Sequence, residues 1–92
     1  SGVPKPTDKD WHWWGKLNEN HEGVVVVIRG SDGEDERKIN IPWVSSGSNY
    51  SIKQLFTNKE LGTYSGRELQ DGIIELLLPS FGQEILLVSL ID

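Results

Sequence analysis

The chain has 92 residues, a length that suits one small domain. It contains no cysteine, which excludes a disulfide framework, a thiolate zinc site and a cysteine nucleophile. Nine Lys and Arg against 14 Asp and Glu give a net charge of −5, which argues against nucleic acid and anionic membranes as partners, because both attract basic surfaces.

Residues 1–10 hold two prolines and four charged side chains, a composition typical of an extended leader or linker. The chain lacks methionine and begins with Ser1-Gly2, so we expect a piece of a longer protein with a cloning remnant at its start. The longest apolar run, Val24–Ile28, is far shorter than the roughly 18 residues that a membrane span needs. We therefore expect one domain over residues 11–92.

Short apolar segments separated by Gly, Asn, Asp and Ser fill that domain. They are Trp11–Leu17, Gly23–Arg29, Arg37–Trp43, Tyr50–Phe56, Leu61–Tyr64, Ile73–Leu78 and Glu84–Ile91. Their spacing of about 8–14 residues predicts an all-β fold, a single antiparallel β-sandwich of about seven to eight strands with Greek-key connections. A helix is the competing prediction for Asn49–Leu55 and for Gln83–Ile91. Tyr50 and Ile52 favour a strand in the first segment, and the β-branched residues and the preceding Phe81-Gly82 turn favour a strand in the second.

Three of these strands are apolar on both faces, which an isolated two-sheet sandwich does not need. In the second strand Val24 and Val26 share one face, while Val25 and Val27 share the other. Two explanations stay open: the second face is covered by the first strand or a loop of this chain, or it docks on a neighbouring domain. Much of the core is expected from Ile39, Ile41, Ile52, Leu55, Leu76, Phe81, Ile85 and Leu87.

Patterns that indicate catalysis are nearly absent. His12 and His21 lie nine residues apart without metal-ligand spacing, and no glycine-rich loop could hold a phosphate. The acidic cluster Asp32–Glu36 has no calcium-loop spacing and predicts a solvated loop, which would be the recognition feature of a protein–protein interaction sandwich. We expect no catalytic residues, no metal and no cofactor in this chain.

The four tryptophans point to either packing or binding. In the first strand Trp11 and Trp13 share one face and are expected in the core, whereas His12 and Trp14 share the other and are expected to be half-exposed. An exposed indole can stack on the apolar face of a pyranose, so Trp14 and Trp43, with His12, are the candidate carbohydrate-binding residues if the fold brings them together. The alternative is that Trp14 packs on a neighbouring domain or plugs the end of the barrel.

The second half of the chain carries a family resemblance. Its segments Tyr50–Tyr64, Leu69–Ile73 and Leu78–Val88 resemble the C-terminal β-domain of glycoside hydrolases of the α-amylase and α-galactosidase type, in which a small Greek-key sandwich follows a catalytic barrel. The resemblance extends over roughly Gly23 to Ile91 and rests on turn and core residues. It implies a non-catalytic accessory domain that packs on the catalytic domain of its parent polypeptide and stabilises it. A glycan is a second expected partner, which an autonomous carbohydrate-binding module would contact through its tryptophans.

Overall fold

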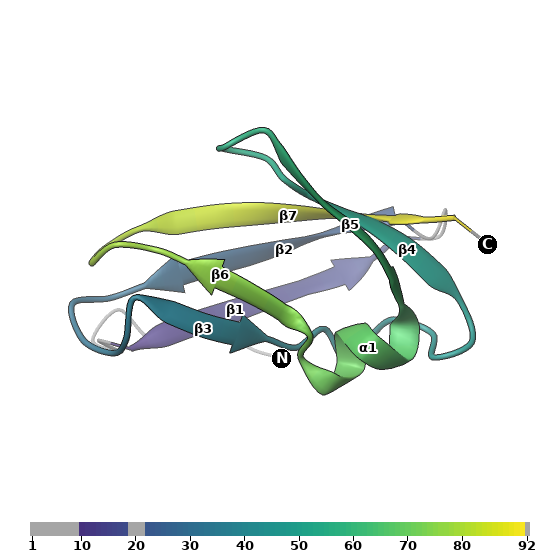
Figure 1. The fold of residues 1–92 in the computed structure, drawn as a ribbon, viewed down its shortest axis with the longest axis horizontal. Helices are drawn as coiled ribbons and strands as arrows, with labels where there is room; N and C mark the ends of the chain where they lie inside the picture. The colour runs from purple at the N-terminus through teal and green to yellow at the C-terminus, as the bar shows by residue number, and fades with distance from the viewer. Residues whose placement is uncertain (1–9, 19–21, 92) are drawn as a thin grey trace.

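The computed structural model describes residues 10–18 and 22–91, so the predicted leader lies outside the described residues except for Asp10. This part of the chain contains seven strands and one short helix (Figure 1). They are β1 (Trp11–Leu17), β2 (Glu22–Arg29), β3 (Glu36–Ile39), β4 (Asn49–Gln54), β5 (Lys59–Ser65), α1 (Gly66–Asp71), β6 (Ile74–Leu77) and β7 (Gln83–Leu90). Within the described ranges, no helix is long and apolar enough to cross a membrane. The all-β prediction is confirmed, and β4 and β7 are strands rather than helices.

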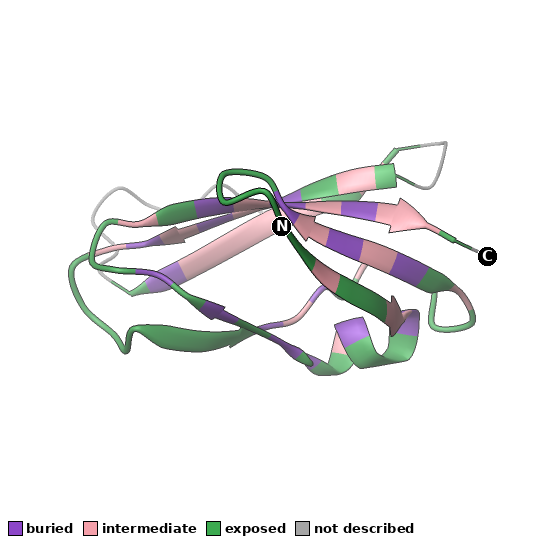
Figure 2. Cartoon of the chain, turned by 45° about the horizontal axis from the view of Figure 1, so that its top comes forward, coloured by how far each residue is buried: buried purple, intermediate pink, exposed green. Residues whose placement is uncertain are grey.

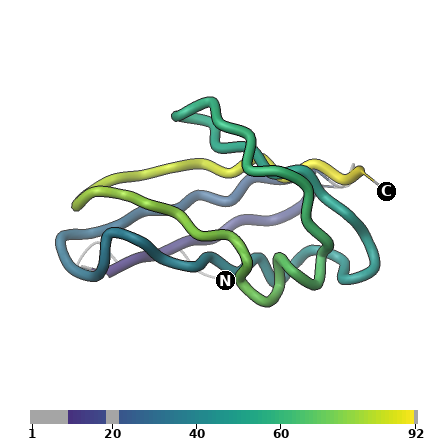
Figure 3. The backbone as a smooth tube through the Cα atoms, viewed as in Figure 1, coloured from purple at the N-terminus to yellow at the C-terminus, as the bar shows by residue number. Residues whose placement is uncertain are grey.

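The strands form two antiparallel sheets. The larger sheet has the order β1-β2-β7-β4-β5, and the smaller one pairs β3 with β6. The order is non-sequential, since the last strand lies between β2 and β4. The tube trace shows the chain leaving β2 and β6 by turns at the same end of the molecule, while α1 lies near the other end of β3 and β6 (Figure 3). The core draws side chains from both sheets, which makes the fold a sandwich.

The inner face of the larger sheet is the face turned toward β3 and β6. Its buried side chains include Val25 and Val27 of β2 and Leu86 and Val88 of β7, which alternate with less buried neighbours along each strand (Figure 2). The predicted core residues Ile39, Ile41, Ile52 and Leu76 are buried as expected.

Four predicted core residues lie elsewhere. Ile85 and Leu87 are only half-buried, because the opposite face of β7 carries the buried positions. Leu55 follows the end of β4 in the hairpin turn and is 43% exposed. Phe81 is 73% exposed, because it occupies the β6–β7 turn with a left-handed φ of 62° that directs the chain around the end of the sheet.

Helix α1 was not predicted. Ser65 begins it with a capping box: its hydroxyl accepts a hydrogen bond from the Glu68 N–H at 3.1 Å, and the Glu68 carboxylate accepts one from the Ser65 N–H at 2.9 Å. Gly72 ends it with a left-handed φ of 87°. Buried Leu69 accepts a hydrogen bond from the Ile41 N–H at 2.8 Å, so the helix is tied to the segment after β3.

A buried arginine organises the predicted acidic loop. Arg29 at the end of β2 is 5% exposed, and its guanidinium donates to the Asp35 carboxylate, to the Leu78 carbonyl at 2.7 Å and to the Gly33 carbonyl at 2.9 Å. These charge-assisted bonds hold the loop against the sandwich and join it to the end of β6.

A buried carboxylate supports the β4–β5 hairpin in a comparable way. Glu84 is 1% exposed and accepts hydrogen bonds from the backbone N–H groups of Phe56 at 2.8 Å and Ile85 at 3.0 Å. Its second oxygen accepts from the side chains of Gln54 at 3.3 Å and Thr57 at 3.2 Å. Four donors therefore satisfy the one carboxylate that faces the interior on β7.

Candidate functional site

The four tryptophans form two pairs: among the residues that the structure describes, the indole N–H groups of one pair donate hydrogen bonds, and those of the other pair do not. Trp11 donates to the Glu34 carbonyl at 2.7 Å, and Trp13 donates to the Asn40 carbonyl at 2.9 Å and to the Asn40 side-chain oxygen at 3.1 Å. Trp11 is buried and Trp13 packs on the core, so the expectation that both belong to the inner face is confirmed. In the described part of the chain, the indole N–H groups of Trp14 and Trp43 form no hydrogen bond.

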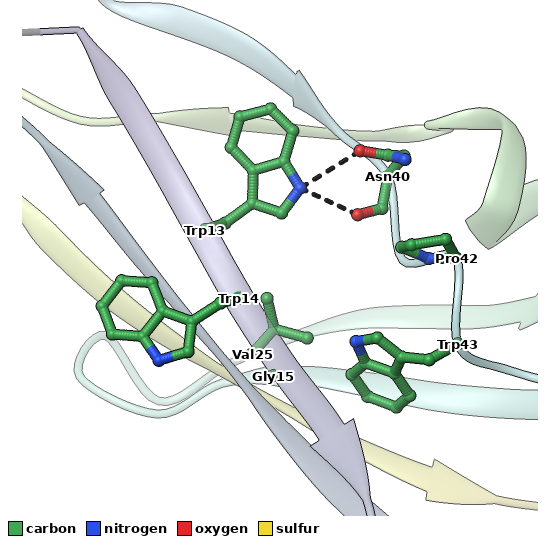
Figure 4. A pocket seen from close by; sticks show the side chains of 7 residues that line it. All are labelled: Trp13, Trp14, Gly15, Val25, Asn40, Pro42 and Trp43. Carbon is green, nitrogen blue, oxygen red and sulfur yellow. Dashed lines mark hydrogen bonds between the residues drawn. The ribbon is translucent and has the colours of Figure 1, made fainter. Parts of the chain in front are cut away.

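A pocket of about 220 Å³ brings this second pair together at the free edge of β1 (Figure 4). Its lining residues are Trp13, Trp14, Gly15, Val25, Asn40, Pro42 and Trp43. The predicted candidate Trp43 comes from the segment that follows β3, and Trp14 comes from β1. The third candidate, His12, does not line this pocket: it pairs with Ile28 and is half-buried.

Trp43 reaches the pocket because β3 is shorter than predicted. The expected strand Arg37–Trp43 ends at Ile39, and the chain then turns through Pro42, whose nitrogen cannot donate to a strand partner. The Ile41 N–H bonds to helix α1 instead of a strand. Trp43 therefore lies in a turn, with its ring packed partly on the core and partly at the pocket.

Gly15 keeps this edge of the sheet thin. A Cβ atom at Gly15 would lie 2.0 Å from the carbonyl oxygen of Val24, so the close approach of β2 excludes every other residue type without a backbone shift. Gly15 lies between Trp13 and Leu17 along β1 and lines the pocket together with the Trp13 and Trp43 rings. A glycine inside an otherwise continuous strand pattern is the signal by which the sequence could have indicated this pocket.

The pocket is aromatic and uncharged. None of its lining side chains is ionisable, and the polar groups of these side chains are the amide of Asn40 and the indole N–H groups of the three tryptophans. Because an indole nitrogen only donates, the bond from Trp13 fixes the Asn40 oxygen toward that ring and turns the amide nitrogen away from it (Figure 4). Arg37 approaches the Trp13 ring, with its guanidinium carbon 5.8 Å from the ring centroid. The bonds to Asn40 and the contact with Arg37 hold the Trp13 ring in place, so the ring forms a rigid wall of the pocket.

The second surface of interest is the outer face of the larger sheet, which points away from β3 and β6. Six apolar side chains share it: Trp14, Val24, Val26, Ile28, Ile85 and Leu87. Val24 is 44% exposed and the others are half-buried. Strand β1 pairs at the edge of the same sheet, so the expectation that the first strand covers this face is wrong.

Strand register arranges the outer face in rows. Trp14, Val26 and Ile85 lie side by side on β1, β2 and β7. In the adjoining row Lys16 and Lys53 lie at the two ends of the Val24–Leu87 pair. A shallow hollow of about 360 Å³ lies between β1 and β2, lined by Trp14, Gly15, Lys16, Val24 and Val26. Trp14 therefore borders both the pocket and the outer face.

Comparisons with known proteins add no relative: no family model, no curated protein and no solved structure matches this chain.

Proposed function

We propose that this chain is a non-catalytic accessory domain of a carbohydrate-active enzyme, which docks on the catalytic domain of its parent polypeptide and stabilises it. The observation that carries the proposal is the outer face, where six apolar side chains are contiguous across three strands of the larger sheet. The resemblance of the second half of the chain to the C-terminal β-domains of glycoside hydrolases supplies the class of partner.

Surface energetics favours a covered outer face. Each 100 Å² of apolar surface removed from water contributes about 2.5 kcal/mol, and a contiguous exposed apolar patch is a mark of an interaction surface. Polar and charged side chains on the solvent face of an antiparallel sheet would suffice for folding. Val24 and Leu87 contribute little to the core from this side, so their apolar character is explained by a partner.

The lysines at the rim define the chemistry of the partner surface. Lys16 and Lys53 flank the Val24–Leu87 row, and their alkyl stems extend the apolar area while the ammonium groups stay at its border. A complementary surface has an apolar centre and carboxylate or carbonyl oxygens opposite the two lysines.

The test uses the full-length protein encoded by the parent gene and a matched pair of variants. Val26→Glu places a charge at the centre of the outer face, and Ser89→Glu places the same charge at its polar end beside Glu22 and Ser51. Both side chains point outward, so the isolated domain should stay folded by circular dichroism. In the full-length protein, Val26→Glu should lower the melting temperature of the catalytic domain, and Ser89→Glu should not. Absence of a carbohydrate-active domain in the parent gene, or equal melting temperatures for both variants, would overturn the proposal.

A further inference from the structure

We infer that the pocket at Gly15 binds a single pyranose ring of a neutral glycan, with Trp43 as its stacking platform. This site and the docking surface share Trp14 at their border, but Trp43 lines only the pocket and does not belong to the outer face. A domain can therefore use both surfaces, one toward its own enzyme and one toward that enzyme's substrate.

The chemistry of the lining selects an uncharged ligand that has both apolar and polar edges. Three indole rings and Pro42 supply apolar faces, and no ionisable side chain lines the pocket. A carbohydrate ring presents C–H groups on one face, which suit the electron-rich face of an indole. Its hydroxyl groups both donate and accept, so a hydroxyl oxygen can accept from the Trp43 N–H, which has no partner in the described part of the chain.

The size of the pocket favours one sugar ring over an extended peptide. Its volume of about 220 Å³ is below the roughly 300–1,000 Å³ of pockets that enclose larger ligands. Proline-rich peptides need a longer groove lined by successive aromatic side chains. Here the Trp13 and Trp43 rings flank one short hollow (Figure 4).

The hydrogen bonds around the pocket hold it in a binding-competent form. The Trp13 ring is fixed by its two bonds to Asn40, and Trp43 packs partly on the core. Side chains that are already ordered lose little rotamer entropy on binding, which favours affinity for a small ligand.

The indole resonances of the protein provide a test that needs no substitution. We would titrate the 92-residue chain with maltohexaose, cellohexaose and a β-galactan oligosaccharide to millimolar concentration and record the nitrogen–proton NMR correlations of the four indole groups. The Trp43 signal should move most with at least one of these sugars. The Trp11 signal should stay in place, because its N–H is buried against the Glu34 carbonyl.

Variants then separate stacking from hydrogen bonding. Trp43→Ala should weaken binding of the responsive sugar by about tenfold or more, the scale of removing an aromatic anchor. Trp43→Phe keeps a ring and most of the packing but removes the hydrogen-bond donor, so it should bind the sugar with intermediate affinity. This variant still tests the site if Trp43→Ala does not fold. Phe56→Ala, an exposed aromatic in the β4–β5 turn, is the matched control and should bind like the wild type.

Three results would overturn the inference. One is that none of the neutral sugars moves the Trp43 signal. Another is that an anionic oligogalacturonide binds as tightly as the neutral sugars, because the uncharged lining gives no reason for it. The third is that a proline-rich decapeptide moves the Trp43 signal and the sugars do not, which would assign the pocket to peptide recognition. None of these results depends on whether the outer face docks.

Discussion

Both faces of the larger sheet carry apolar side chains, but the two faces differ in how far these side chains are buried. On β2, Val25 and Val27 are buried, while Val24, which precedes Val25 and points to the other face, is 44% exposed. They differ because the small sheet of β3 and β6 covers the inner face, whereas within residues 10–18 and 22–91 no second sheet covers the outer face. Folding of this domain therefore does not require the apolar residues on the outer face, and the docking proposal rests on this excess.

The sharpest test of that difference compares two adjacent leucines of β7. Leu86 is fully buried on the inner face, whereas Leu87 is half-buried on the outer one. Leu86→Ala should lower the free energy of unfolding by about 2–5 kcal/mol, because it leaves a cavity in the core. Leu87→Ala should lower it by less than about 1 kcal/mol. Urea titration of both variants measures the difference, and equal losses would show that the two faces contribute equally to folding.

A second prediction concerns the one carboxylate on the inner face of β7. Glu84→Gln should lower the free energy of unfolding of the isolated domain by about 1–3 kcal/mol. The amide N–H₂ would replace one carboxylate oxygen and would face groups that donate hydrogen bonds to that oxygen in the wild type. Thermal unfolding of this variant would be compared with that of Glu75→Gln, an exposed position on β6. Equal melting temperatures for the two variants would show that the hydrogen bonds to residue 84 do not require a negative charge there.

A third prediction contrasts tryptophans on opposite sides of β1. Trp11→Phe removes the donor to the Glu34 carbonyl and part of a buried ring, so it should cost about 1–2 kcal/mol of stability. Trp14→Phe changes a half-buried indole without a hydrogen-bond partner in the described residues and should cost less than about 0.5 kcal/mol. Denaturant titrations followed by far-ultraviolet circular dichroism avoid the change in tryptophan fluorescence. A larger loss for Trp14→Phe would place its ring in the core.

Much of the strand content could be predicted from the sequence, because the period and the turn residues are local signals. The segment Trp11–Leu17 is a strand with the predicted bounds, and the alternation of Ile39 and Ile41 correctly placed both in the core. The inner face of β2 and β7 could not be predicted from the period alone. Alternate residues of both strands are equally apolar, and only the position of β3 and β6 decides which set is buried.

The helix and the pocket show two other limits. The spacing of Ser65 and Glu68 is a capping box and could have indicated α1, although a six-residue helix leaves no periodic pattern of its own. The sequence proposed Trp14 and Trp43 as a pair, and the fold brings both to one pocket. It did not indicate Trp13 and Asn40, because their contact joins residues 27 positions apart across the two layers.

The smallest effect is expected for Phe81, which the sequence predicted to lie in the core. Burial of Phe81 would have made Phe81→Ala cost about 3–5 kcal/mol through a cavity, but the ring is 73% exposed and leaves none. The turn is held instead by the backbone: the Phe81 N–H donates to the Gly30 carbonyl at 3.1 Å, and the Gly82 N–H donates to the Pro79 carbonyl at 2.8 Å. Alanine keeps both bonds and meets the same left-handed backbone, so stability should change by less than about 0.5 kcal/mol in a denaturant titration. A loss above about 2 kcal/mol would mean that the Phe81 ring packs on the sandwich in solution. Phe81 would then contribute to stability as an inner-face side chain does.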